Sequence, residues 1–160
     1  MKLRKILVPL DGSPLAESAL GEGIQLAGAG GALVLLRAAE APRVAVGDPV
    51  EAQVAVVREA EAYLDAVAER ARAAGVADVE TAVWYGPAGE SIVEAARTRD
   101  IDLIVMSSHG RSGLGRMIFG SVAESVMRGT TTPVLIIRPE GAPVAGIRST
   151  GARPAEPSRV

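Results

Sequence analysis

Five short aliphatic runs recur along the chain, and they limit its fold more than any other feature of the sequence. They lie at residues 5–9, 32–38, 79–85, 102–107 and 133–139. Four are nearly continuous in Val, Ile and Leu, whereas residues 79–85 alternate more between apolar and polar side chains. Continuous runs are typical of strands that are covered on both faces in a parallel sheet. We therefore predict a parallel sheet with residues 79–85 at one edge.

Amphipathic helical patterns separate these runs, at residues 13–29, 51–74, 89–100 and 121–129. The second pattern predicts a buried stripe of Val54, Val57, Leu64, Val67, Ala68 and Ala71. The last pattern opens with Ser121 and Glu124, which fit an S-x-x-E capping box, and stops at Gly129. Residues 40–50 contain two prolines and predict a loop. Strands that alternate with helices, joined by right-handed crossovers, predict an α/β fold: an open five-stranded parallel sheet with helices on both faces.

The composition of the 160-residue chain favours one folded domain and excludes several kinds of site. The chain has no cysteine and one histidine, so disulfides and Cys-based zinc sites are excluded and a His-based metal site is not expected. Its net charge of −2 gives no general basic field for nucleic acid. We find no signal peptide and no membrane span. We expect a soluble cytoplasmic protein, with a single domain at residues 1–139 and a disordered tail at 140–160.

Polar or small residues follow the first, second and fourth predicted strands, in the segments PLDGS (9–13), RAAE (37–40) and 106–122. Ligands of open parallel sheets bind outside the carboxyl ends of the strands, so we expect these segments to converge. Asp11 can accept hydrogen bonds from a ribose or hold Mg²⁺, or it can only shape an Asx turn or helix cap. Ala38 and Met106 can flank an aromatic base, or they can simply belong to the core.

The stretch at residues 106–122, MSSHGRSGLGRMIFGSV, is rich in glycine and serine. Glycines let backbone N–H groups approach a phosphate, and the start of the following helix favours an anion. His109, Arg111 and Ser121 can add hydrogen-bond donors. The same glycines can instead serve only to turn the chain. The stretch is no Walker A loop, the first strand is not followed by G-x-G-x-x-G, and no spacing of residues indicates catalysis.

Three segments together resemble the universal stress protein family: ILVPLDGS, GPAGESIVEAA and SHGRSGLGRMIFGSVAESVMRGTTTPVLIIRP. The resemblance covers roughly residues 3–139. The nucleotide-binding signature of the family is G-x2-G-x9-G-[ST], and Gly110, Gly120 and Ser121 match its last three elements. Ser107 stands in place of the first glycine. The resemblance implies a Rossmann-like fold of the adenine nucleotide alpha-hydrolase type, with the strand order 3-2-1-4-5.

The resemblance also implies ATP as the ligand, with Asp11 on the ribose, Ala38 and Met106 near the adenine, and the glycine stretch on the phosphates. Mg²⁺ can accompany ATP, with Asp11 as its nearest candidate. Residue types and resemblance together give the predicted nucleotide-binding set: Pro9, Leu10, Asp11, Ala38, Met106, Ser107, His109, Gly110, Arg111, Gly113, Gly120, Ser121 and Val122.

Three hypotheses of function follow. The first is an ATP-binding regulatory or signalling protein of the stress response with little or no catalysis. The second is a dimeric interaction module that binds no nucleotide, which Ser107 favours. The third is a slow ATPase, with His109 as its one candidate base. In the first two, the resemblance implies a homodimer that pairs through the strand at residues 133–139, and covering an apolar edge strand agrees with this. A further protein partner is expected but not identified.

Overall fold

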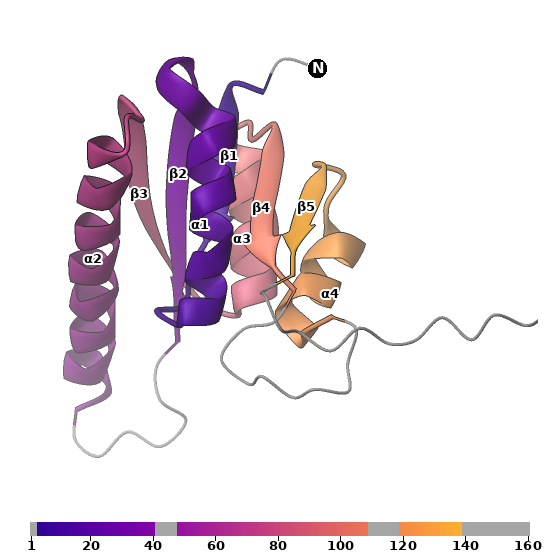
Figure 1. The fold of residues 1–160 in the computed structure, drawn as a ribbon. Coiled ribbons are helices and arrows are strands. Elements are labelled where there is room, and N and C mark those ends of the chain that lie inside the picture. The colour runs from indigo at the N-terminus through magenta and orange to yellow at the C-terminus, as the bar shows by residue number, and fades with distance from the viewer. Residues whose placement is uncertain (1–2, 41–47, 109–118, 139–160) are drawn as a thin grey trace, which may run out of the picture.

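We describe residues 3–40, 48–108 and 119–138 of a computed structural model (Figure 1). Strands and helices alternate as predicted, and the chain also forms a short 3-10 turn at Gly28–Gly30. The strands are β1 (Lys5–Pro9), β2 (Ala32–Ala39), β3 (Asp78–Tyr85), β4 (Leu103–Ser107) and β5 (Val134–Ile137). The helices are α1 (Pro14–Ala27), α2 (Pro49–Ala73), α3 (Ala88–Thr98) and α4 (Ser121–Gly129).

The five strands form one parallel sheet in the order β3-β2-β1-β4-β5, which confirms the predicted fold. The strand at residues 79–85 lies at an edge, as its alternating pattern predicted. The crossover from β1 leads through α1 to β2 on one side, and β4 pairs with β1 on the other side. The sheet therefore changes winding direction between β1 and β4, which is where an open α/β sheet leaves room for a ligand.

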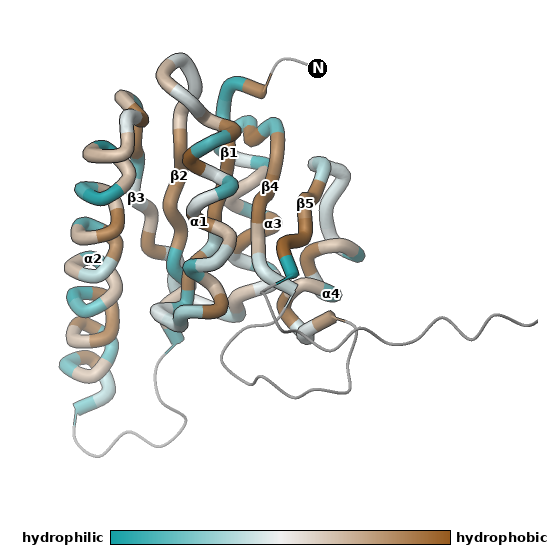
Figure 2. Tube along the Cα trace, viewed as in Figure 1, coloured by the Kyte–Doolittle hydropathy of each residue, from teal (hydrophilic) through white to brown (hydrophobic). Residues whose placement is uncertain are grey.

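Two apolar cores cover the two faces of the sheet. Ile6, Val8 and Leu35 pack against α1 and α2, whereas Leu7 and Ile104 pack against α3 and α4. Neighbouring residues of one strand thus point into opposite cores, because side chains alternate along a strand. Figure 2 shows the result as hydrophobic colour along the central strands and on the sides of the helices that face them. This two-sided burial is why the strands read as continuous aliphatic runs.

The predicted capping box at Ser121 is wrong. Gly120 is the N-cap of α4, in an extended conformation, and its carbonyl accepts the backbone N–H of Glu124 at 3.0 Å. Ser121 is already the first helical residue, and among the described residues no side chain caps this helix. The Glu124 carboxylate instead binds Arg128 one turn later, with 2.6 Å between Oε1 and Nη2. The Glu124 carboxylate thus forms an i,i+4 ion pair instead of the backbone hydrogen bond that a capping box requires.

The predicted stripe of α2 is buried from Leu64 onward, but Val54 is 43% exposed. The helix begins at Pro49, with Asp48 as its cap, and its first turns extend beyond the carboxyl ends of the strands (Figure 1). Those turns have no sheet to cover, which is why Val54 faces solvent. Residues 41–47 of the predicted loop and residues 139–160, with the predicted tail, lie outside the described residues.

Candidate functional site

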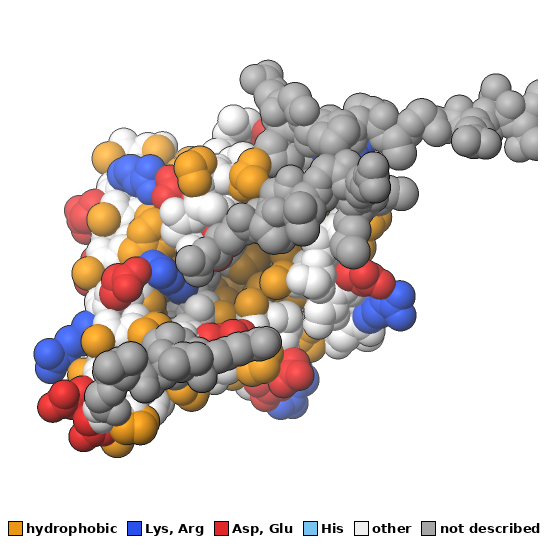
Figure 3. Space-filling view, turned by 90° about the horizontal axis from the view of Figure 1, so that it is seen from below, with side chains coloured by type: hydrophobic (Ala, Val, Ile, Leu, Met, Phe, Trp, Pro, Cys, Tyr) orange, Lys and Arg blue, Asp and Glu red, His pale blue; other side chains and the backbone are white. Residues whose placement is uncertain are grey.

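A cavity of about 370 Å³ opens at the carboxyl ends of the strands. Figure 3 looks onto this end of the molecule, where hydrophobic side chains gather around a hollow. Every described residue of the predicted set lines the cavity: Pro9, Leu10, Asp11, Ala38, Met106, Ser107, Gly120, Ser121 and Val122. The other four, His109, Gly110, Arg111 and Gly113, lie outside the described residues. The structure thus brings three distant segments together, and their role towards a ligand stays a prediction.

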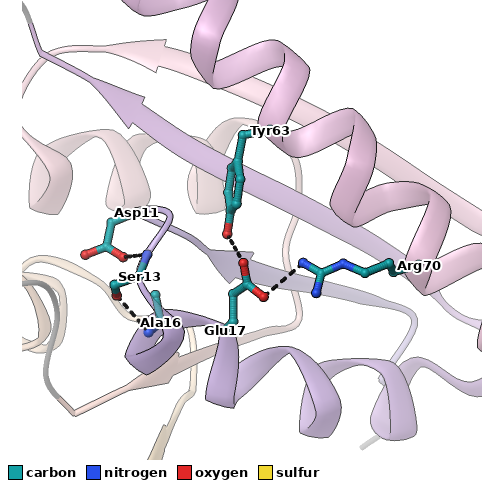
Figure 4. Close-up of polar contacts among 6 residues, drawn as sticks. All are labelled: Asp11, Ser13, Ala16, Glu17, Tyr63 and Arg70. Atoms are coloured by element: carbon teal, nitrogen blue, oxygen red, sulfur yellow. Dashed lines mark hydrogen bonds and ion pairs between the residues drawn. The ribbon is translucent and has the colours of Figure 1, made fainter.

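The turn after β1 fixes Asp11 at the cavity wall. Its Oδ1 accepts the backbone N–H of Ser13 at 2.9 Å, and Ser13 Oγ accepts the backbone N–H of Ala16 at 3.1 Å as the cap of α1 (Figure 4). Gly12 between them has a φ of +82°, which an L side chain rarely adopts. The Asx turn and the ligand-facing position are therefore compatible, because one carboxylate oxygen builds the turn while Asp11 also lines the cavity.

Backbone hydrogen bonds hold the end of β4 next to the start of α4. Ser108 N–H donates to Ile137 O at 2.9 Å, and Gly120 N–H donates to Ser108 O at 2.7 Å. Ser107 and Ser108 are buried, and Ser121 begins α4 beside them at the cavity. No side chain of the described residues caps the first N–H groups of α4, so these groups and the helix dipole favour an anion at this part of the cavity wall.

Apolar side chains form much of the cavity wall. Leu36 and Met106 are almost fully buried, and Ile92 and Ala88 of α3 complete the wall beside Ala38. A flat apolar ring fits such a wall better than a charged group does, because the wall offers dispersion contacts and few polar partners. The cavity lining therefore combines apolar side chains, the Asp11 carboxylate and a helix start that favours an anion.

Sequence reasoning missed the contributions of α2 and α3, and it named Arg37 and Glu40 only as part of the segment at residues 37–40. Ala88 and Ile92 of α3 and Val56 of α2 line the cavity, as do Arg37 and Glu40 of the β2 end. The segment GPAGESIVEAA carries the α3 pair at i,i+4 spacing, a signal that shows one helix face but not its partner. No local pattern indicates Val56, which lies 17 residues beyond the end of β2.

Arg37 is held at the cavity wall by residues of α2. Its Nη2 lies 3.1 Å from Glu59 Oε1, and its guanidinium lies 5.0 Å from the centroid of the Tyr63 ring. The side chain of Arg37 is only 16% exposed. A guanidinium over an aromatic face is attracted by the ring quadrupole, so Arg37 has a defined position before any ligand arrives.

A second layer of polar contacts supports Tyr63. Its hydroxyl donates to Glu17 Oε1 at 2.8 Å, and Arg70 Nη2 donates to Glu17 Oε2 at 2.9 Å (Figure 4). Burial raises the pKa of the Tyr63 hydroxyl, and the hydrogen bond to Glu17 raises it further. The phenol is therefore a neutral donor at any physiological pH, and it links α1 to α2 behind the cavity.

Within residues 3–40, 48–108 and 119–138, no three His, Cys, Asp or Glu side chains gather to hold a metal ion. Nor does any helix in those ranges have the length and apolar character needed to cross a membrane.

Comparison with known proteins agrees with this architecture. The model of the universal stress protein family matches residues 2–138. The chain belongs to the universal stress protein family. It is 32% identical to Universal stress protein MJ0531 of Methanocaldococcus jannaschii over 140 residues, which is 84% of this chain and 82% of that protein. It is also 32% identical to a putative universal stress protein of Staphylococcus aureus over 145 residues, 88% of this chain and 87% of that protein.

Solved universal stress proteins share the fold. UspA from Lactobacillus plantarum has a TM-score of 0.76 and 25% identity, covering 86% of this chain and 99% of that one. A universal stress protein solved in complex with cAMP has a TM-score of 0.61 and 29% identity, covering 86% of this chain and 98% of that one. The likeness thus includes a relative that binds an adenine nucleotide.

Proposed function

We propose that this universal stress protein binds adenine nucleotides, with ATP as its preferred ligand, and acts as a cytoplasmic regulatory protein of the stress response with little or no catalysis. The adenine would lie against Ala38 and Met106, and Asp11 would accept hydrogen bonds from the ribose. The phosphates would lie at Gly120 and the start of α4. Mg²⁺ would enter with ATP, held mainly by the phosphates as this ion usually is, with Asp11 as the nearest carboxylate.

One observation carries this proposal. The cavity of about 370 Å³ where the sheet changes winding direction is lined by apolar side chains, by the Asp11 carboxylate and by the start of α4. These match the three parts of a nucleotide, which are a base, a ribose and phosphates, and the volume lies within the usual range of ligand sites. The relative solved with cAMP supports the adenine class of ligand.

The first experiment is mass spectrometry of nucleotide extracted from the purified protein, followed by calorimetric titration of ATP with and without Mg²⁺. We expect co-purified adenine nucleotide or saturable binding of ATP. Gly120→Val should abolish it, because the new side chain stands where the phosphates approach. A folded protein that releases no nucleotide and shows no heat with ATP, AMP or cAMP would favour the interaction module that binds none.

Ser107 is the observation that favours this second candidate. It lines the cavity, is 7% exposed, and stands where the family signature has a glycine. A slow ATPase is the third candidate, and its proposed base, His109, lies outside the described residues. Steady-state turnover that His109→Ala abolishes would establish it over the other two.

The proposal includes a homodimer that pairs through residues 133–139, in which the two β5 strands meet. β5 is an edge strand of the sheet, and its Leu135 is 37% exposed. An apolar edge strand exposes unpaired backbone groups and invites another strand, so a partner copy would stabilise it. Leu135→Lys should shift the mass in solution from dimer to monomer. An unchanged mass would exclude β5 as the interface.

A further inference from the structure

Arg37 is the one cationic side chain among the described residues that line the cavity at the carboxyl ends of the strands. Its guanidinium lies against the turn that follows β1. A β-carbon placed on Gly12 would lie 3.7 Å from Arg37 Nη1 and 3.9 Å from Arg37 Cζ. Gly12 directly follows Asp11, so a guanidinium and a carboxylate lie on neighbouring parts of the cavity wall.

α2 sets the direction of the guanidinium. Glu59 and Tyr63 are four residues apart, so they lie on one face of this helix. Glu59 Oε1 accepts a hydrogen bond from Arg37 Nη2, and the Tyr63 ring centroid lies 5.0 Å from Arg37 Cζ. A donor that two partners already hold loses little conformational freedom when a ligand arrives, which favours binding.

Arg37 keeps hydrogen-bond donors that the fold does not use. A guanidinium has five N–H groups, and among the described residues only Glu59 accepts one of them. Nε and Nη1 donate to no described residue. Within the described ranges, no fully buried side-chain nitrogen or oxygen lacks a partner, so these two nitrogens are not closed off from solvent. The ion pair with Glu59 thus holds Arg37 in place and leaves donors for a ligand.

The charges around Arg37 favour a neutral acceptor over an anion. Glu59 balances the guanidinium, and Asp11 and Glu40 line the same cavity. A phosphate beside Arg37 would therefore meet three carboxylates and one cation, which costs free energy in a partly buried site. A hydroxyl group carries no net charge, and it can accept from a guanidinium while it donates to a carboxylate.

We propose that Arg37 is a specificity-determining residue of the nucleotide site and that, together with Asp11, it selects ligands with a free ribose diol. This inference rests on the proposed function, in which Asp11 accepts hydrogen bonds from the ribose. Arg37 Nε or Nη1 donates to an oxygen of the same diol. ATP and AMP supply both kinds of partner, whereas a ligand without the hydroxyls leaves a guanidinium and a carboxylate without theirs.

The test compares ATP with dideoxy-ATP, the analogue that lacks both hydroxyls of the ribose diol. The full-length protein is titrated with each in the calorimeter, with Mg²⁺ present throughout. We expect the parent to bind ATP about a hundredfold more tightly, because hydrogen bonds to two charged groups are lost in the analogue. In Arg37→Met, ATP should bind about tenfold more weakly than in the parent while dideoxy-ATP changes little. Arg37→Lys keeps a cation and a donor, so its preference should lie between the two.

Two further variants separate positioning from direct contact. Glu59→Ala should lower the preference for ATP by a few-fold, because it releases Arg37, and it should add nothing when combined with Arg37→Met. Arg58→Met removes an exposed arginine of α2 beside Glu59 and is the matched control, so it should bind both ligands like the parent. Circular dichroism checks that each variant is folded.

Failure of this inference can be told apart from failure of the proposed function. If the parent binds neither ligand, the proposed function is wrong and this inference with it. If the parent binds ATP but Arg37→Met keeps the full preference over dideoxy-ATP, only this inference is wrong. Equal weakening of both ligands in Arg37→Met would make Arg37 a structural residue. Tighter binding of adenosine bisphosphate, with its second phosphate on the ribose, than of AMP would make Arg37 a phosphate-binding residue and overturn the selection of a free diol.

Discussion

The polar residues at the amino ends of the five strands differ in their contacts from those at the carboxyl ends. We call these two sides of the sheet the amino edge and the carboxyl edge. At the amino ends of the strands, the Asp102 carboxylate accepts the backbone N–H groups of Arg4 at 2.8 Å and Lys5 at 2.9 Å. Glu80 there binds Lys5 at 3.0 Å and Arg99 at 2.9 Å. At the carboxyl ends, polar groups such as those of Asp11 and Ser107 line a cavity instead. Polar side chains at the amino ends thus bind neighbouring parts of the protein, whereas polar side chains at the carboxyl ends also line a cavity.

Parallel topology explains the difference. Every crossover helix ends near the amino edge and begins near the carboxyl edge, so helix starts such as those of α1 and α4 point their N–H groups at the same side. The free N–H groups at these helix starts favour the binding of anions at the carboxyl edge. We conclude that substitutions at the amino edge should change stability and those at the carboxyl edge should change binding, and four substitutions test this.

The largest effect is expected for Asp11→Ala. Loss of a charged acceptor in the cavity should weaken ATP by about a hundredfold, since a hydrogen bond to a charged group contributes roughly 1.5–3 kcal/mol. Asp11→Asn is the matched control for the turn, because its amide oxygen can still accept the Ser13 N–H. Calorimetric titration of both variants, with thermal unfolding, separates binding from stability. If Asp11→Ala binds ATP with the affinity of the parent, the ribose does not bind at the end of β1.

Asp102→Ala tests the opposite edge and should lower the melting temperature while leaving the ATP affinity unchanged. The backbone N–H groups of Arg4 and then Lys5 lower the pKa of the Asp102 carboxyl by hydrogen bonding. A pKa that is lowered on folding contributes stability above the ordinary carboxyl pKa and loses it as the pH falls. In chemical unfolding followed against pH, the difference in stability between parent and Asp102→Ala should therefore shrink in acid. A difference that grows in acid would contradict this account.

The contrast between the edges also marks how far sequence reasoning reaches. Runs such as residues 5–9 predicted the strands because two covered faces leave no polar position. Asp11, Ala38 and Met106 were found together because parallel strands end at one edge. Val56 was missed, and so were the contacts that Arg37 makes with α2, because a contact between a strand end and a helix depends on how the helix is rotated and how far it extends. The exposed Val54 has the same cause, since periodicity does not show where the sheet ends.

The intermediate effect concerns Tyr63, which lies behind the cavity between the two edges. Tyr63→Phe removes the donor to Glu17 and should cost about 1 kcal/mol of stability. Because burial raises the pKa of the Tyr63 hydroxyl, its contribution is complete below the ordinary phenol pKa and is lost as the pH rises above it. Tyr85→Phe is the matched control, since the Tyr85 hydroxyl donates to no described residue. Chemical unfolding at neutral and alkaline pH measures both, and equal losses would exclude the Glu17 contact as the cause.

The smallest effect is expected at Ser107, the carboxyl-edge residue that pairs with Ile137 of β5. Ser107→Gly removes a side chain from the cavity wall and restores the family signature, so a phosphate can approach the backbone more closely. We expect ATP to bind a few-fold more tightly, with a loss of roughly 1 kcal/mol in stability from the glycine in a strand. Both Ser107→Gly and Ser108→Gly, a change at the neighbouring buried serine, are titrated with ATP in the calorimeter. A gain in affinity in Ser107→Gly alone shows that the position matters, whereas an equal gain in both shows that backbone flexibility is the cause. A gain from no binding to strong binding would mean that Ser107 closes the cavity in the parent. The carboxyl edge would then be built for a nucleotide that this chain no longer accepts.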